Sequence, residues 1–532
     1  MNAQRVMFAG ARVVDGDHDE IGDVLVADGR IVRTGRDLEA GVAANEPDVR
    51  IVDARGRLLV PGFIDMHAHS GITLFGEPEL TAKISSGYTT DLICPDGLGA
   101  APVRPAAVAD RRQYLAALET GEAPWDWESF GDYLRAIGQA GPAVNIAACV
   151  PHSAVRDYVM GGAARAADAR EVREIAALAA ECLDQGGHAI SFGLIYAPGL
   201  YAERDELMAL GEVAAGYGVP LVPHIRNEAD MVLDSVREFV DISRRTGARV
   251  HLSHLKIIGN AHLLEDLHDL IQRSGDDVDL TFDQYPYGAG STLLSALLPK
   301  HFFEGGAPKM MARLSDPHER RRMAREMRDG LPGWENIYGN VGPENIDITQ
   351  TSPVHADLVG MTVAAISEHR GTSPEDTIFD LLLDCRLNVG MIDHYSAESV
   401  VRSIFSIPRG MVGTDGVFNE HPHPRLYGTS ARVLGRYSLR ENLVSTQEAV
   451  ARLSTRPADC LGLSDRGRIA EGKRADLVLI DPEAFIDSAT YASPTTAPEG
   501  IDLVMVNGTV ALGEGADGTH SGQVLDRAVA AH

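Results

Sequence analysis

The stretch LLVPGFIDMHAH, residues 58–69, is an apolar run that ends in two histidines one residue apart. Such a run predicts a buried β-strand. Because side chains at positions i and i+2 of a strand point to the same face, His67 and His69 present two imidazoles to one point. The pair predicts either part of a metal site or two polar residues on one face of a strand, and the rest of the chain decides between them.

Seven further strand candidates follow this stretch, and helical stretches separate them. The helical stretches, such as 171–187 and 229–247, carry apolar residues at helical spacing and end in glycine. This alternation is typical of βα units. The further strand candidates are TTDLICPDG (89–97), NIAACVPHS (145–153), AISFGLIY (189–196), VPLVPHIRN (219–227), RVHLSHLKI (249–257), VDLTFDQYPY (278–287) and GMVGTDG (410–416).

The eight units predict an α/β protein with a TIM-like (β/α)8 barrel over residues 61–465. In such a barrel the active site lies where the carboxyl ends of the strands meet. An open, doubly wound parallel sheet is the alternative that the spacing leaves in place.

Two other regions have a different texture. Residues 1–60 and 466–525 are short β-type runs with turn residues between them, which predicts a small β-sandwich domain built from both termini. About 125 residues separate the seventh strand candidate from the eighth, several times the length that a βα connection needs. We therefore expect an insertion between strands 7 and 8, at approximately 300–390, and favour a lid over the barrel mouth above a plain surface excursion.

Composition limits the partners and the compartment. The formal net charge is -28 and the chain has no basic run, which argues against nucleic acid and anionic membranes as partners. Its five cysteines are an odd number without a CxxC pair, which favours a reducing compartment. With no leader-like start and no long apolar run, the chain is expected to be soluble and cytoplasmic. The sequence predicts no oligomeric state.

Metal-binding side chains recur at the predicted strand ends. A barrel would bring these ends to one cavity, and zinc accepts imidazole, thiolate and carboxylate ligands. The shared position makes a metal site the stronger interpretation, although each residue alone could be a buried core residue or a turn residue. The candidates are His67, His69, Cys94, His224, His254 and Asp415.

The chain resembles the amidohydrolase superfamily and, within it, the N-acyl-D-amino-acid deacylases, also called D-aminoacylases. The matching blocks run through nearly the whole chain in family order. They are PGFIDMHAH (61–69), GYTTDLICPDG (87–97), SFGLIYAPGLYAERDEL (191–207), PHIRNEAD (223–230), LSHLK (252–256), DQYPYGAGSTLLSALLP (283–299), VGTDG (412–416), HPRLYGTSARVLGRYSLRE (423–441) and GRIAEGKRADLVLID (467–481).

The resemblance implies zinc as the cofactor. It implies that Cys94, His224 and His254 hold one tight zinc ion, with the cysteine able to bridge. His67, His69 and Asp415 then surround a second, weaker position, and Asp415 is also the catalytic acid and base. The fourth strand candidate has no lysine to bridge two metals, which weakens an assignment as a hydantoinase or dihydroorotase.

The resemblance also implies an N-acyl amino acid as substrate, with Lys256, Tyr285, Ser291 and Arg425 as its contacts. We expect Arg425 to bind the substrate carboxylate, with Lys256 and Tyr285 assisting. Arginine suits this role because its guanidinium can donate two parallel hydrogen bonds to a carboxylate. The expected reaction is zinc-dependent hydrolysis of the amide bond of N-acyl-D-amino acids; the preference for the D hand rests on the resemblance alone. Two alternatives stay open: another metal-dependent amide hydrolase on the same scaffold, and a non-catalytic binding protein.

Two stretches depart from the family pattern. Ser70 and Gly71 stand where relatives often have an acidic residue, and the loop after Cys94 reads PDGLG instead of the commoner GxS form. These departures concern the second metal position and the shape of the pocket.

Overall fold

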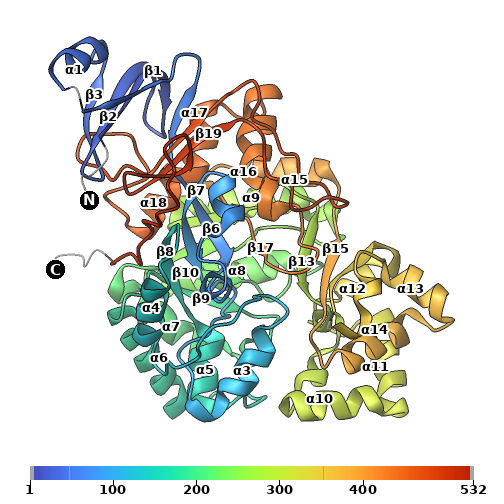
Figure 1. The fold of residues 1–532 in the computed structure, drawn as a ribbon. Helices are drawn as coiled ribbons and strands as arrows, with labels where there is room; N and C mark the ends of the chain where they lie inside the picture. Colours follow the sequence, from blue (N-terminus) through green and yellow to red (C-terminus); the bar gives the residue numbers. More distant parts are fainter. Residues whose placement is uncertain (1–4, 47, 352, 528–532) are drawn as a thin grey trace.

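The computed structural model describes residues 5–46, 48–351 and 353–527. Its centre is a parallel sheet whose strands run in sequence order, β6 to β12, and end on the segment 410–417 (Figure 1). The strands are β6 (Phe63–His69), β7 (Tyr88–Ile93), β8 (Asn145–Pro151), β9 (Ala189–Gly193), β10 (Pro220–His224), β11 (Arg249–Leu252), β12 (Leu280–Gln284), β16 (Gly410–Val412) and β17 (Gly416–Val417).

The sheet curls round until its last segment meets its first strand. Residues 410–412 pair with β12, and residues 416 and 417 pair with Ala68 and His69 of β6. This arrangement is that of a TIM-like barrel, and each of the eight predicted strand stretches contains a strand of it. Nearly every residue of these strands is buried, as expected for a parallel sheet that helices cover.

Helices pack outside the sheet because each has one apolar face. In α8 the buried residues Val232, Val236, Phe239 and Val240 recur at helical spacing, and Gly247 ends the helix in the left-handed conformation with φ 78°. The outer helices include α2 (Thr81–Ser85), α4 (Phe130–Ala140), α5 (His152–Met160), α6 (Ala169–Asp184), α7 (Arg204–Tyr217), α8 (Val232–Thr246), α9 (Leu264–Asp277), α15 (Glu398–Phe405), α16 (Arg425–Ser430), α17 (Thr446–Val450) and α18 (Arg456–Leu461).

Both ends of the chain build a second sheet, which lies beside the amino-terminal ends of the barrel strands in Figure 1. Strand β18 pairs antiparallel with β5 and so joins the two ends, whereas β4 and β5 run parallel to β1. The strands form one mixed sheet of eight, so the sandwich form stays a prediction. They are β1 (Val6–Val14), β2 (Asp19–Ala27), β3 (Arg30–Gly35), β4 (Arg50–Asp53), β5 (Leu58–Pro61), β18 (Leu477–Ile480), β19 (Ile501–Val506) and β20 (Thr509–Gly513).

Between β12 and β16 the chain forms a small sheet, with strand order β13-β15-β14, and a group of helices. These elements have their own apolar cluster, which includes Phe302, Leu314 and Phe379, and they project to one side of the barrel (Figure 1). The limits 300–390 and the lid role stay predictions. The elements are β13 (Ala289–Leu293), β14 (Ile346–Gln350), β15 (Gly390–His394), α10 (Gly306–Ser315), α11 (Pro317–Asp329), α12 (Ile337–Val341), α13 (Val363–Arg370) and α14 (Pro374–Asp384).

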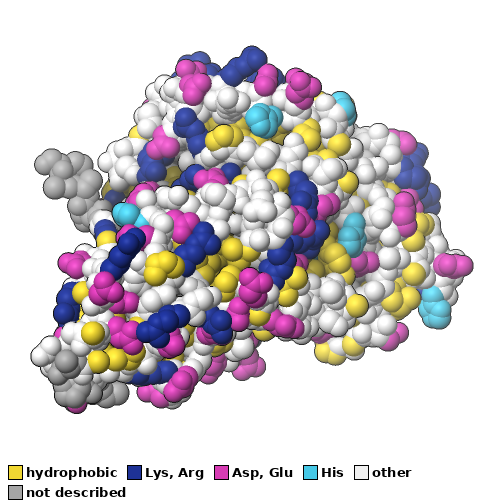
Figure 2. Space-filling view, turned by 90° about the horizontal axis from the view of Figure 1, so that it is seen from above, with side chains coloured by type: hydrophobic (Ala, Val, Ile, Leu, Met, Phe, Trp, Pro, Cys, Tyr) yellow, Lys and Arg dark blue, Asp and Glu magenta, His cyan; other side chains and the backbone are white. Residues whose placement is uncertain are grey.

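Figure 2 shows acidic and basic side chains interspersed over one face of the molecule. Among the described residues, no helix combines the length and the apolar character needed to cross a membrane.

Candidate active site

Four histidines and one aspartate come together from four strand ends, and all of them except His67 line one cavity. His67 and His69 come from β6, and His224 is the last residue of β10. His254 follows β11 and Asp415 lies between β16 and β17, where both adopt a positive φ, 34° and 49°, as the chain leaves the sheet. All five are buried. The predicted convergence of these five strand-end residues is therefore present in the structure.

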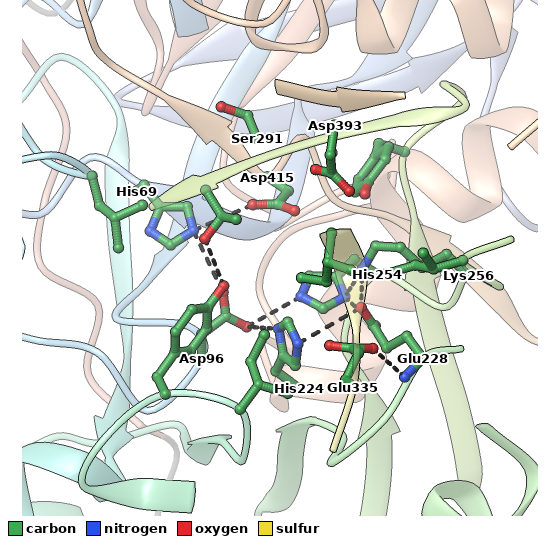
Figure 3. Close-up of a pocket in the computed structure, with 18 residues that line it drawn as sticks. His69, Asp96, His224, Glu228, His254, Lys256, Ser291, Glu335, Asp393 and Asp415 are labelled. Carbon is green, nitrogen blue, oxygen red and sulfur yellow. Dashed lines mark hydrogen bonds and ion pairs between the residues drawn. The ribbon is translucent and has the colours of Figure 1, made fainter. Parts of the chain in front are cut away.

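Asp96 joins these residues into two groups that share it. The atoms of His67, His69, Asp96 and Asp415 that could bind a metal lie within 4.8 Å of one another, and so do those of Asp96, His224 and His254. The two carboxylate oxygens of Asp96 face different groups (Figure 3). Oδ2 lies 3.2 Å from His67 Nε2, and Oδ1 lies 3.3 Å from His254 Nε2. Asp96 therefore has the geometry of a bridging carboxylate.

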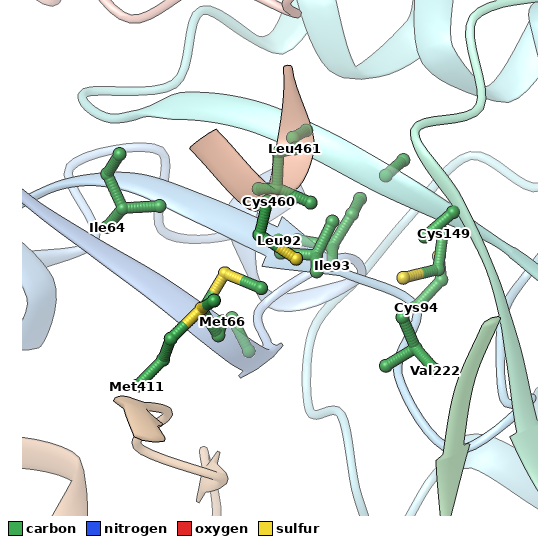
Figure 4. Packing of buried hydrophobic residues seen from close by; sticks show 14 of the residues in the cluster. Ile64, Met66, Leu92, Ile93, Cys94, Cys149, Val222, Met411, Cys460 and Leu461 are labelled. Carbon is green, nitrogen blue, oxygen red and sulfur yellow. The ribbon is translucent and has the colours of Figure 1, made fainter. Parts of the chain in front are cut away.

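Cys94, which the sequence placed at this position, is outside both groups. Strand β7 ends at Ile93, and Cys94 turns the chain with φ 59°. Its side chain lies in the barrel core beside Cys149 and Val222 (Figure 4), where burial raises the pKa of the thiol well above its usual value. The structure thus places the thiol of Cys94 in the core and Asp96 at the cavity, and zinc binding by Cys94 stays a prediction.

The two groups have the properties that zinc requires. In the described part of the chain, His67 Nδ1, His69 Nδ1, Asp96 Oδ1 and both ring nitrogens of His224 are buried without a hydrogen-bond partner. Buried polar atoms are rarely left unpaired in folded proteins. Imidazole nitrogens and carboxylate oxygens are ordinary zinc ligands. The unpaired atoms and the donor set together fit a centre for one or two zinc ions.

Glu228 contacts the group of Asp96, His224 and His254, through the histidine ring nitrogens that do not face Asp96. Its Oε1 lies 3.0 Å from His254 Nδ1, and its Oε2 lies 3.6 Å from His224 Nε2 and 2.7 Å from Lys256 Nζ. A carboxylate behind a ligating histidine fixes the orientation of the ring and increases its basicity. The sequence analysis missed Glu228, although it lies four residues after His224 in a quoted block.

The predicted substrate-binding residues lie together on one side of the cavity. Lys256, Tyr285 and Ser291 line it, whereas Arg425 lies fully buried behind them. The Arg425 guanidinium lies over the Tyr285 ring at 4.3 Å, and Nη2 donates to the Ser291 carbonyl at 3.2 Å. Nε and Nη1 of Arg425 have no hydrogen-bond partner among the described residues. Both nitrogens are buried, and Arg425 is not among the residues that line the cavity.

The same arginine sets the charge of Asp415. Burial alone would raise the pKa of Asp415, but Arg425 and the neighbouring histidines outweigh it and hold the pKa well below its usual range. Lys256 is likewise kept protonated, because Glu228 outweighs the effect of burial and raises the lysine pKa. Asp415 therefore enters any reaction as a carboxylate.

Two more acidic residues line the cavity and were not singled out from the sequence. Glu335 comes from the insertion and Asp393 from β15, and both are labelled in Figure 3. Neither had a signal to set it apart among the 76 acidic residues of the chain. Apolar side chains of Leu118, Ile195, Ile258 and Ile337 complete the wall.

The chain is similar to curated deacylases over nearly its whole length. The chain is 32% identical over 528 residues to the N-acyl-D-glutamate deacylase of Alcaligenes xylosoxydans xylosoxydans, which covers 98% of this chain and 96% of that protein. It is 31% identical to the D-aminoacylase of the same organism, with 99% of this chain and 98% of that protein covered.

Solved structures agree with these similarities. The N-acyl-D-glutamate deacylase of Bordetella bronchiseptica, complexed with zinc and a phosphonate inhibitor, superposes with a TM-score of 0.82 at 30% identity and covers 99% of this chain and 100% of that chain. A D-aminoacylase structure gives a TM-score of 0.81, again at 30% identity, and covers 98% of this chain and 99% of that chain. The amidohydrolase family pattern matches residues 50–512. The chain therefore belongs to the amidohydrolase family.

Proposed function

We propose that the protein is a zinc-dependent enzyme that hydrolyses the amide bond of N-acyl-D-amino acids and releases a carboxylate and a free D-amino acid. The observation that carries the proposal is the bridging position of Asp96 between two histidine groups, next to Lys256, Tyr285 and the two partnerless nitrogens of Arg425. The identity of the relatives supports the substrate class and the D hand.

The architecture that we propose is a closed (β/α)8 barrel whose strand ends supply the zinc ligands. Asp96, His224 and His254 would hold the tighter ion, and His67, His69 and Asp415 would surround the weaker one with Asp96 between them. Cys94 is left out of this ligand set. When bound, zinc supplies Lewis acidity, which polarises the scissile carbonyl and makes water a stronger nucleophile at neutral pH.

The side chains of the cavity would divide the remaining work. Lys256, Tyr285, Ser291 and Arg425 bind the substrate carboxylate and so direct the acyl group toward the histidines. Asp415, which is ionised, takes a proton from the attacking water as the new carbon–oxygen bond forms. It then gives this proton to the amine nitrogen as the carbon–nitrogen bond breaks.

The test is a set of paired D- and L-N-acetyl amino acids, with zinc present and release of free amine as the readout. We expect hydrolysis of D substrates, its loss on chelation, and its return when zinc is added. Asp415→Asn should remove the activity while zinc content is measured in parallel. Equal turnover of both hands, or no turnover by zinc-loaded protein, would overturn the proposal.

A further inference from the structure

The wall of the cavity is rich in acidic side chains. Five carboxylates line the cavity, namely those of Asp96, Glu228, Glu335, Asp393 and Asp415. Asp96 and Asp415 belong to the proposed zinc centre, and Glu228 is paired with Lys256 at 2.7 Å. Glu335 and Asp393 remain, and within the described ranges neither has an ion-pair partner within 4.0 Å.

One carboxylate oxygen of Glu335 accepts a backbone hydrogen bond, and the other has no partner among the described residues. Its Oε1 accepts a hydrogen bond from the backbone nitrogen of Glu228 at 2.5 Å. Its Oε2 is buried and has no hydrogen-bond partner among the residues described. Glu335 is only 4% exposed, and it lines the cavity. A buried carboxylate oxygen without a partner costs free energy, so it marks a place where a ligand can supply the missing hydrogen bond.

The carboxylate of Asp393 occupies space that Gly290, its partner on the neighbouring strand, leaves open. It pairs with Gly290 of β13, and a Cβ at residue 290 would lie 2.7 Å from Asp393 Oδ1. A larger residue at 290 would therefore push the carboxylate away. Burial raises the pKa of Asp393 to about 7 and that of Glu335 to about 8, and the charge of Asp393 adds to the shift at Glu335. Both groups would be stabilised as carboxylates by a nearby cation.

The wall of the cavity is partly apolar. Ile258 and Ile337 line the same cavity, and Ile337 is two residues from Glu335. A long side chain with an aliphatic stem and a charged end matches such a surface, because the stem packs on apolar groups while the end reaches a polar one.

We propose that this cavity selects N-acyl amino acids whose side chain ends in a cation, as in lysine or arginine, and that Glu335 and Asp393 determine this specificity. The inference rests on the proposed function, since it concerns the substrate side chain at the same site. It separates this protein from relatives described as deacylases of N-acyl-D-glutamate and N-acyl-D-aspartate, whose substrates carry the opposite charge.

The test compares substrates of similar size that differ in charge. The two pairs are N-acetyl-D-arginine with N-acetyl-D-citrulline, and N-acetyl-D-lysine with N-acetyl-D-norleucine. In at least one pair we expect kcat/KM for the charged substrate to exceed that for the neutral one by about tenfold or more, because a charge pair in a desolvated pocket is strong. Glu335→Gln and Asp393→Asn should each reduce this ratio by roughly tenfold. Smaller ratios in both pairs would overturn the inference.

Matched controls separate specificity from general damage. Glu344→Gln and Asp357→Asn change exposed acidic residues of the same insertion and should leave the ratio unchanged. If the protein hydrolyses neutral or acidic N-acetyl-D-amino acids but shows no preference for the cation, the inference fails and the proposed function stands. If it hydrolyses none of them with zinc bound, the proposed function itself fails. Because each variant is judged by a ratio between two substrates, partial loss of folded protein does not alter the result.

Discussion

Arg425 Nη2 lies 2.9 Å from Asp415 Oδ1, and the guanidinium is fully buried. This pair connects the proposed carboxylate-binding residue to the proposed acid and base. A substrate carboxylate at Arg425 Nε and Nη1 would share the guanidinium with Asp415, so substrate binding and the charge of the catalytic aspartate are linked. In the proposed reaction, the Arg425–Asp415 ion pair would lie between the recognised carboxylate and the hydrolysed bond.

Arg425→Met should lower kcat/KM for N-acetyl-D-leucine by about 100-fold, because it removes the proposed carboxylate partner and leaves Asp415 unpaired. The loss should be at least about tenfold smaller for N-acetyl-D-leucinol, which has no carboxylate. Steady-state kinetics on both substrates checks this. Arg321→Met, at an exposed arginine of α11, serves as the control. Equal losses on both substrates would assign Arg425 to the positioning of Asp415 alone.

Asp96→Asn should reduce the zinc content of the purified protein, because one residue serves both groups of ligands. Cys94→Ala should leave zinc content nearly unchanged, since the thiol lies in the core. Metal analysis measures both. Cobalt substitution adds an independent readout: a thiolate ligand gives a charge-transfer band in the near ultraviolet, and we expect this band to be absent. Its presence, and its loss in Cys94→Ala, would restore Cys94 as a ligand.

The difference between Cys94 and Asp96 shows how far sequence reasoning reaches at this site. Alternation within a strand correctly paired His67 with His69, because both lie inside β6. The same rule stops at Ile93, where β7 ends and the chain turns through a left-handed residue. Beyond that point the direction of a side chain depends on the turn. The chemistry of a thiol favours Cys94 as a zinc ligand. In the structure, however, the Cys94 side chain lies in the barrel core, and it is Asp96 that lines the cavity.

Residues far apart in the chain were harder still to foresee. Strand order and the shared strand ends follow from local apolar runs, so the barrel strands could be predicted. Glu335 and Asp393 reach the cavity only through the packing of the insertion, which local patterns do not encode. Their proposed role rests on their place in the cavity wall.

Lys83→Met should destabilise the protein by about 3 to 5 kcal/mol, the usual cost of removing one partner from a buried charge pair. Lys83 Nζ bonds the Asp65 carboxylate and lies 3.6 Å from Asp91 Oδ1, and all three side chains are inaccessible to solvent. Asp65 also accepts hydrogen bonds from the backbone nitrogens of His67 and Thr414. Urea denaturation measures the loss. Adding Asp65→Asn should recover part of it, and a loss below about 1 kcal/mol would contradict the prediction.

Glu335→Gln should make the free energy of unfolding fall less as pH rises from about 5 to about 8. Burial and the charge of Glu228 raise the pKa of Glu335 to about 8 in the folded protein, from an ordinary value of 4.5. Between these values the folded state holds a proton that the unfolded state has lost, so the free energy of unfolding falls as pH rises through this window. Glutamine cannot lose the proton. The variant should therefore gain stability relative to wild type between about pH 5.5 and about pH 8.5, measured by urea denaturation at equal zinc concentration. A difference that is constant with pH would contradict the shift.

Gly413→Ala should weaken zinc binding at the His67 and His69 position. A Cβ on Gly413 would lie 2.7 Å from His67 Cβ and 2.6 Å from Asp283 Oδ1, and both neighbours are buried. Since a buried histidine cannot move aside without displacing its imidazole, the added methyl group should misalign the ligand. Zinc stoichiometry and competition with a chelator measure the loss of affinity.

Gly216→Ala, on an exposed turn of α7 where a Cβ meets nothing within 4 Å, is the matched control and should stabilise the helix by about 0.5 to 1 kcal/mol. Unchanged zinc affinity in Gly413→Ala would mean that His67 is not held by the contact between β6 and the segment 410–417.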